Sequence, residues 1–361
     1  MTLTDIGMPH GLDLVPRLPE GAAPLNRKSF TSDQEVRWCP GCGDYAILSA
    51  VQSFLPELGV APENVVVVSG IGCSSRFPYY VDTYGMHSIH GRAPAIATGV
   101  AVARPDLSVW VATGDGDALS IGGNHLIHAM RRNVNLKILL FNNEIYGLTK
   151  GQYSPTSPTG TVTKSTPTGS VDRPFNPVSL ALGSEATFVA RTMDSDRKHF
   201  TEVLRAAAAH RGTALIEILQ NCPIFNDGAY DVLKDRTSAQ SRILWLEAGE
   251  EVTVGAEKET VAVWSGGSGI NLIPRSEAEP ALILHHDPAA ADPSQAFALS
   301  RLDDPALSHI AMGIFRQVSA PAYDDGVRAQ VDAARSAAGP VDDAAMEKLL
   351  AGGDTWTVGE S

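Results

Sequence analysis

The chain has 361 residues, a formal net charge of −13, four cysteines and 43% hydrophobic residues. This length suits one large domain or two ordinary ones, with a sizeable core. The negative charge argues against nucleic acid as a main partner, because phosphate binding requires clustered Lys and Arg. No apolar run approaches the roughly 20 residues that cross a membrane, and no pattern of a secretory signal is present. We therefore expect a cytoplasmic protein with no membrane contact.

Residues 1–30 are expected to form an irregular N-terminal arm, and residues 31–227 an α/β domain. Short runs rich in Val, Ile and Leu predict buried parallel strands; they are 65–69, 109–113, 136–142 and 214–219. Segments of helical periodicity lie around these strands; they are 46–55, 95–103, 126–132 and 200–210. This order predicts a doubly wound, mostly parallel sheet with helices on both faces. Ligands of such sheets bind at the carboxyl ends of the strands.

Two further regions have a different character. Residues 153–177 are rich in Pro, Ser, Thr and Gly, and we expect an ordered active-site loop or lid there. In residues 228–361 the pattern weakens, with helices expected near 293–301 and 326–338. We interpret this part as a smaller, irregular C-terminal lobe or a tail that wraps around a partner.

A Gly-Asp-Gly-Asp motif at 114–117 follows the strand predicted at 109–113, and Asn142 and Asn143 end the strand predicted at 136–142. Neighbouring parallel strands place their carboxyl ends at the same edge of a sheet, so Asp115 and Asn143 can share one ion. Mg²⁺ prefers carboxylate and neutral oxygens together with phosphates, and the carbonyl of Ile145 can complete the protein's share. The pattern resembles the magnesium–diphosphate motif of thiamine-diphosphate enzymes. Two ordinary turns at strand ends are the alternative.

The four cysteines are Cys39, Cys42, Cys73 and Cys222. Cys39 and Cys42 have Cys-x-x-Cys spacing before a predicted helix, whereas Cys73 and Cys222 each follow a predicted strand. Four thiolates bind either Zn²⁺ or an iron–sulfur cluster. A nearby thiamine cofactor favours a [4Fe–4S] cluster, because its decarboxylated adduct requires an electron acceptor. Structural zinc, or four unrelated buried cysteines, remain the alternatives.

With these residues taken together, the chain resembles the beta subunit of 2-oxoacid:ferredoxin oxidoreductases from Trp38 to about Arg236. Five blocks carry this resemblance: WCPGCGDYAIL at 38–48, GIGCSSR at 70–76, HGRAPAIATG at 90–99, GDGDALSIGGNH at 114–125, and NNEIYGLTKGQYSPTSPTG at 142–160. The resemblance implies the four cysteines as cluster ligands, and Asp115, Asn143 and Ile145 as magnesium ligands. It also implies thiamine-diphosphate contacts at Ile71, Gly72, Cys73, Ser74, His90, Gly116, Asp117, Gly147 and Leu148.

Three residues are candidates for the chemistry at the substrate. Lys150 follows Ile145 by five residues, and its ammonium can bind a carboxylate of a dicarboxylic 2-oxoacid. Arg76, three residues after Cys73, can assist it. His90 can donate a hydrogen bond to a phosphate oxygen. The alternatives are a solvated surface lysine for Lys150 and a core histidine for His90.

The resemblance implies thiamine-diphosphate-dependent oxidative decarboxylation of a 2-oxoacid, with coenzyme A as acyl acceptor and electrons passing through one [4Fe–4S] cluster to ferredoxin. We expect 2-oxoglutarate as the substrate, with pyruvate or branched 2-oxoacids as alternatives. An alpha subunit, in a heterotetramer, is expected to carry the pyrimidine-binding domain. Ferredoxins are usually acidic, so docking requires a local basic patch or a basic partner subunit. A non-redox thiamine decarboxylase or nucleotide-binding module with a Cys₄ zinc site is the alternative of another class.

Overall fold

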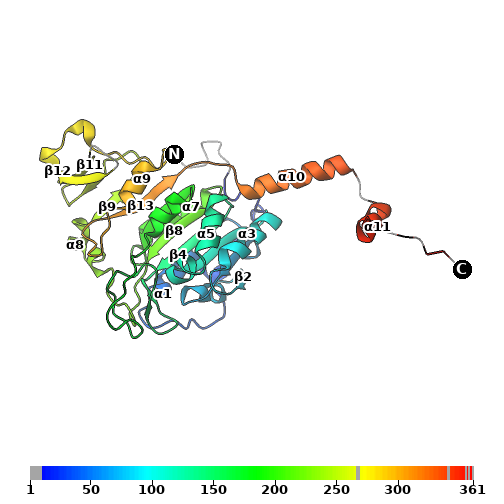
Figure 1. The fold of residues 1–361 in the computed structure, drawn as a ribbon, viewed down its shortest axis with the longest axis horizontal. Helices are drawn as coiled ribbons and strands as arrows, with labels where there is room; N and C mark the ends of the chain where they lie inside the picture. Colours follow the sequence, from blue (N-terminus) through cyan, green and yellow to red (C-terminus); the bar gives the residue numbers. More distant parts are fainter. Residues whose placement is uncertain (1–9, 266–268, 340–341, 354–355, 357, 360–361) are drawn as a thin grey trace.

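The computed structural model describes residues 10–361 apart from 266–268, 340–341, 354–355, 357 and 360–361. Its centre is an eight-stranded sheet in the order β2-β1-β3-β4-β8-β7-β13-β9 (Figure 1). The strands span Val65–Ser69 (β1), Tyr84–His87 (β2), Ser108–Gly114 (β3), Lys137–Asn142 (β4), Phe188–Met193 (β7), Ala214–Leu219 (β8), Ile243–Leu246 (β9) and Ile310–Gln317 (β13). In this sheet, each pair of neighbouring strands from β2 to β7 is parallel, and so is the pair β13–β9. The pair β13–β7 is antiparallel. The predicted mostly parallel sheet is therefore confirmed.

Helices cover both faces of this sheet. They span Asp44–Phe54 (α1), Ala93–Ala103 (α3), Gly123–Arg131 (α5), Pro177–Gly183 (α6), Arg197–Ala209 (α7) and Ser294–Ser300 (α9). Val66 and Val68 of β1 belong to the hydrophobic core that includes α3, α5, α6 and α9, whereas Val65 and Val67 belong to the core with α1 and α7. Side chains alternate across a strand, so the all-apolar run of β1 fits burial on both faces.

The four predicted helices start two or three residues earlier than expected, and for α3 and α7 a signal at the N-terminus explains the difference. Pro94 occupies the first turn of α3, where its missing N–H costs nothing. Asp196 caps α7, since its carboxylate accepts a hydrogen bond from the His199 amide at 3.0 Å, as N-cap residues do. The strands at 65–69 and 214–219 have the predicted bounds.

The C-terminal residues contribute to the main sheet as well as to peripheral elements. β9 and β13 extend the sheet, while β10 (Thr253–Val254), β11 (Thr260–Trp264) and β12 (Ile270–Pro274) form a small antiparallel sheet after α8 (Arg236–Gln240). The predicted helices near 293–301 and 326–338 are confirmed as α9 and α10 (Tyr323–Ala338). The division at residue 227 stays a prediction, although β9 and β13 share the sheet of the preceding residues.

Two segments lie at the ends of the described chain. Within the predicted N-terminal arm, Leu12 and Val15 are buried in the core beneath α1 and α7; residues 1–9 lie outside the described part. At the other end, α10 and α11 (Asp343–Ala351) extend away from the body (Figure 1). Only the base of α10 is anchored, by the buried Asp324, which accepts a hydrogen bond from the Asn135 amide. None of the described helices combines the length and apolar character needed to cross a membrane.

Candidate functional site

The loops that follow β1, β3 and β4 meet around a cavity of about 520 Å³ at the carboxyl edge of the sheet. Every residue implied as a magnesium ligand or a thiamine-diphosphate contact lines this one cavity: Ile71, Gly72, Cys73, Ser74, His90, Asp115, Gly116, Asp117, Asn143, Ile145, Gly147 and Leu148. These residues come from four separate segments of the chain. Their individual roles stay predictions, but the predicted gathering at one sheet edge is what the structure has.

Asp115 is buried at the start of the short helix α4 (Asp115–Leu119), directly after β3. The Thr156 hydroxyl donates to its Oδ2 at 2.6 Å, and the Ser154 hydroxyl donates to the same oxygen. Burial raises the pKa of Asp115 to about 6, because an uncompensated charge is costly in a dry site. Neither hydroxyl engages Oδ1, so a cation bound there would stabilise the ionised carboxylate.

Neutral oxygens of Asn143 and Ile145 belong to residues that line the same cavity as this carboxylate. Asn143 follows β4, and the amide of Ile145 donates to its Oδ1 at 3.2 Å. Ile145 begins the two-residue strand β5 (Ile145–Tyr146), which pairs antiparallel with β6 (Gln152–Tyr153). One carboxylate and neutral amide or carbonyl oxygens form the kind of donor set that Mg²⁺ accepts in proteins. The residues present therefore fit a magnesium–diphosphate group.

Asp117 lines the cavity and makes three hydrogen bonds within the chain, while its direct contact with the cofactor stays a prediction. Its Oδ1 accepts hydrogen bonds from the amides of Ile71 at 3.1 Å and Gly91 at 2.8 Å, and its Oδ2 accepts one from the Thr113 hydroxyl at 2.9 Å. Asp117 thus ties the loop after β1 to the loop before α3. Both loops carry residues that line the cavity, so Asp117 holds the shape of the cavity wall.

Replacing Gly70 with alanine is expected to loosen this wall. A Cβ on Gly70 would lie 1.9 Å from Oδ2 of Asp117, so the carboxylate would have to leave its three donors. We expect the free energy of unfolding to fall by about 1–3 kcal/mol, as for other overpacked sites. Chemical denaturation measures this change. Gly99→Ala on α3 is the matched control, because its Cβ would meet no atom within 4 Å; equal losses in both variants would contradict the role of Asp117.

Two of the four cysteines, Cys73 and Cys222, flank Gly147. A Cβ on Gly147 would lie 3.6 Å from Sγ of Cys73 and 3.8 Å from Sγ of Cys222, so both sulfurs flank one point. Cys39 and Cys42 immediately precede α1. Burial raises the pKa of Cys73 to about 12, with contributions from the negative charges of Asp44, Cys222 and Cys39. An ionised thiolate at Cys73 would therefore require a compensating cation.

A structural zinc ion is one alternative for the four cysteines. With Zn–S bonds of about 2.3 Å, a tetrahedral zinc site holds its sulfurs within roughly 4 Å of one another. Among the described residues, which include all four cysteines, no three His, Cys, Asp or Glu side chains converge on a single-ion site. The choice between zinc and a cluster therefore stays a prediction.

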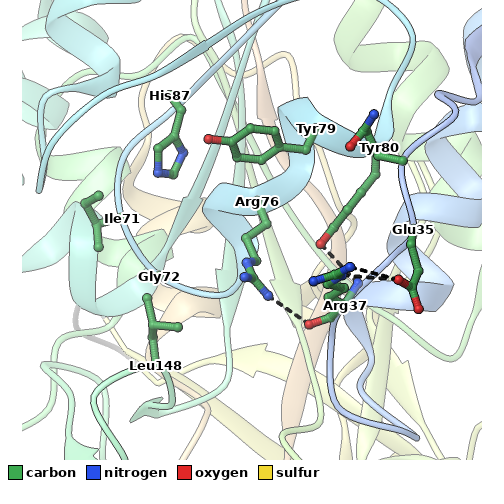
Figure 2. A pocket seen from close by; sticks show the side chains of 10 residues that line it. Glu35, Arg37, Ile71, Gly72, Arg76, Tyr79, Tyr80, His87 and Leu148 are labelled. Atoms are coloured by element: carbon green, nitrogen blue, oxygen red, sulfur yellow. Dashed lines mark hydrogen bonds and ion pairs between the residues drawn. The ribbon is translucent and has the colours of Figure 1, made fainter.

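A second cavity of about 570 Å³ adjoins the first, with Ile71, Gly72 and Leu148 in both linings. Figure 2 shows Arg76 near the centre of this cavity, close to Arg37 and beneath Tyr79. Arg76 is partly buried and donates a hydrogen bond to the carbonyl oxygen of Arg37 at 2.8 Å. Its remaining guanidinium donors are available to an anion next to the cofactor cavity.

Two other substrate candidates occupy exposed positions. His90 is exposed on the rim of the cofactor cavity, so the alternative of a core histidine is wrong. Lys150 is exposed in the turn between β5 and β6, where its φ of 82° is in the left-handed region, and it lines neither cavity. Such a backbone conformation is unfavourable for a residue with a side chain. The structure therefore does not bring Lys150 into the site within this chain, and its substrate role stays a prediction.

Sequence reasoning missed the hydroxyls that hold Asp115 and the residue that contacts Asn143. Ser154 and Thr156 belong to the segment 153–177, whose ordered character was predicted without the roles of its side chains. Gln220, which accepts a hydrogen bond from Asn143 at 2.8 Å, directly follows β8. Its position two residues before Cys222 was the available signal.

Comparisons with known proteins identify the family of this chain. The family described as "Thiamine pyrophosphate enzyme, C-terminal TPP binding domain" matches residues 70–218. The 2-oxoglutarate oxidoreductase subunit KorB of Mycobacterium tuberculosis is 62% identical over 355 residues, which cover 98% of this chain and 94% of that protein. The chain belongs to the beta subunits of 2-oxoacid:ferredoxin oxidoreductases. It is also similar to the 2-oxoacid:ferredoxin oxidoreductase subunit beta of Saccharolobus solfataricus, with 49% identity over 53% of this chain and 63% of that protein.

A solved structure matches more of this chain than the Saccharolobus solfataricus subunit does. The 2-oxoglutarate:ferredoxin oxidoreductase from Magnetococcus marinus, with 2-oxoglutarate, coenzyme A and succinyl-CoA bound, aligns with a TM-score of 0.72 and 34% identity. The alignment covers 92% of this chain and 98% of that chain. This beta subunit is therefore similar to that chain well beyond residues 70–218, including most of its C-terminal part.

Proposed function

We propose that this beta subunit acts in a 2-oxoglutarate:ferredoxin oxidoreductase, which converts 2-oxoglutarate and coenzyme A to succinyl-CoA and CO₂ and passes electrons through one [4Fe–4S] cluster to ferredoxin. The observation that carries the proposal is one cavity lined by all the candidate diphosphate and magnesium residues, with Cys73 in its wall. The similarity to two proteins named for 2-oxoglutarate supports this substrate.

Different residues of this chain would hold the metal ion, the diphosphate and the cluster. Asp115, Asn143 and the carbonyl of Ile145 would hold Mg²⁺, and His90 with the amides of Gly147 and Leu148 would bind the diphosphate. Bound thiamine diphosphate supplies the nucleophilic carbon of 2-oxoacid decarboxylation, which the protein orients. The four cysteines would hold the cluster. Cys73 lines the cofactor cavity while Cys39 is exposed, so the cluster site reaches from the cofactor to the surface where ferredoxin can dock.

An alpha subunit is expected to complete the site, in a heterotetramer. Thiamine enzymes bind the diphosphate and the pyrimidine ring with two related α/β domains, and the described part of this chain has a single large sheet. The cofactor cavity is open and has exposed apolar side chains at its edge, including Ile121 at 58% and Leu148 at 49%. We infer that the alpha subunit brings the pyrimidine-binding domain to this face.

Anaerobic purification with the alpha subunit tests the proposal directly. We expect a brown complex that contains iron, magnesium and thiamine diphosphate. It should reduce methyl viologen with 2-oxoglutarate and coenzyme A faster than with pyruvate or branched 2-oxoacids. A colourless protein with zinc in place of iron would refute the redox function, and faster turnover of pyruvate would refute the substrate. Full activity of the beta subunit alone would refute the need for the partner.

Substitution of the two substrate cations should separate their roles. We expect Arg76→Ala to raise KM for 2-oxoglutarate about tenfold or more, because a hydrogen bond to a charged group contributes about 1.5–3 kcal/mol. Lys150→Ala should reduce the preference for 2-oxoglutarate over pyruvate if the complex brings this lysine to the site. Lys198→Ala is the control, since its side chain is 89% exposed on α7. Unchanged kinetics in either variant would remove that residue from substrate binding.

A further inference from the structure

Gln220 connects the candidate magnesium site to the cysteine site. It is the first residue after β8 and is fully buried. Its Oε1 accepts a hydrogen bond from Nδ2 of Asn143 at 2.8 Å, and its Nε2 donates one to Sγ of Cys42 at 3.3 Å. One side chain therefore contacts a candidate magnesium ligand at one atom and a candidate cluster ligand at another.

The local hydrogen bonds determine which way this amide points. The Nε2 group of Gln220 also donates to the carbonyl oxygen of Asn221, and a carbonyl can only accept. The nitrogen must therefore face Asn221 and Cys42, which leaves Oε1 for Asn143. Asn143 in turn must present its Nδ2 to Gln220, so its Oδ1 points elsewhere. Within the described part of the chain, that oxygen accepts a hydrogen bond from the Ile145 amide alone, and it retains a lone pair for a cation.

The backbone around Gln220 holds this arrangement in place. Its amide donates to the carbonyl of Asn142 at 2.9 Å, and the amide of Gly43 donates to the carbonyl of Asn221 at 3.1 Å. A Cβ on Gly43 would lie 2.9 Å from Cγ of Gln220. The absence of a side chain at Gly43 thus allows the Cys-x-x-Cys segment to approach Gln220 closely.

We propose that Gln220 is a positioning residue for both groups: it orients Asn143 toward magnesium and donates a hydrogen bond to the Cys42 thiolate of the cluster. This inference rests on the proposed function and adds a residue to it. A donor to a ligand sulfur spreads the sulfur's negative charge, and hydrogen bonds to the sulfurs help set cluster potentials. Loss of this donor makes the reduced cluster less stable, so its potential becomes more negative.

Two variants of the purified alpha–beta complex separate the two contacts. Gln220→Met removes both hydrogen bonds at similar volume. We expect about tenfold weaker Mg²⁺–thiamine diphosphate binding, as for other residues that orient metal ligands. We also expect an approximately tenfold shift of the one-electron equilibrium toward the oxidised cluster, which equals 59 mV. Gln220→Glu keeps an acceptor for Asn143, and burial favours its protonated carboxyl, which can still donate to sulfur. We expect it to retain cofactor affinity at low pH, with a cluster potential that becomes more negative than that of the wild type as the pH rises and the carboxyl ionises.

The readouts are titration calorimetry with Mg²⁺ and thiamine diphosphate, and spectroelectrochemical titration of the cluster. Gln52→Met is the matched control. This buried glutamine on α1 donates to the carbonyl of Tyr80 and should leave both quantities unchanged. If Gln220→Met retains iron and has the wild-type potential and affinity, the inference is wrong while the proposed function stands. If the wild-type complex lacks iron, the proposed function itself fails.

Discussion

Asp115→Asn is expected to abolish 2-oxoacid oxidation in the assembled enzyme through loss of bound magnesium and diphosphate. Substitution of residues that merely orient metal ligands costs about 10–100-fold in affinity, so loss of the charged ligand itself should cost at least about 100-fold. The volume stays the same, and the Ser154 and Thr156 hydroxyls retain an acceptor if the asparagine oxygen takes the place of Oδ2. Titration calorimetry with Mg²⁺ and thiamine diphosphate measures the loss, and viologen reduction measures its effect on turnover.

The control for this substitution is Asp106→Asn. Asp106 pairs with Arg104 at 2.7 Å on the surface, and its side chain is 39% exposed. Surface ion pairs of this kind contribute little, so cofactor affinity should stay at the wild-type value. Normal cofactor binding in Asp115→Asn would contradict the role of Asp115 as a magnesium ligand. The burial of this carboxylate beside the two hydroxyls would then have no explanation in cofactor binding.

The fold around this site follows from short-range sequence patterns. The strands at 65–69 and 214–219 have the predicted bounds because continuous Val, Ile and Leu runs are buried on both faces, as the two cores on either side of β1 require. Helix starts were less accurate, since Pro94 and Asp196 define them through caps that lie outside the apolar pattern. Because neighbouring parallel strands end at the same edge of the sheet, the polar residues of the loops that follow them meet there, and no other sequence signal is needed to predict this.

Other features depend on contacts between segments that are far apart in the chain, and sequence patterns do not reveal such contacts. β2 is fully exposed along Tyr84–His87, so it has no apolar pattern, and β13 pairs with a strand more than a hundred residues earlier. The donors to Asp115 are more than thirty-five residues away from it in the chain. Lys150 was assigned by its proximity in sequence to Ile145, but the turn between β5 and β6 carries it to the surface.

Cys222→Ser is expected to separate the redox centre from the thiamine site. Cys222 is buried and lies two residues after Gln220, in the segment that follows β8. Serine is nearly isosteric, but its hydroxyl is a far weaker ligand for iron than a thiolate, since soft sulfur donors are the usual ligands of iron–sulfur clusters. We expect the variant to lose iron and the broad visible absorption, and to reduce ferredoxin only at the background rate. Calorimetry should still detect thiamine-diphosphate binding, because Asp115, Asn143 and Ile145 are unchanged.

Cys39→Ser separates the loss of a metal ligand from the loss of core packing, because Cys39 is exposed whereas Cys222 is buried. If the four cysteines hold one cluster, both substitutions must remove it, regardless of how much packing each residue contributes. If buried Cys222 were only a core residue, Cys222→Ser would lower stability and leave the iron content and the visible absorption intact. Equal loss of iron from both variants, with thiamine-diphosphate binding retained, therefore requires that an exposed and a buried thiolate bind the same metal group.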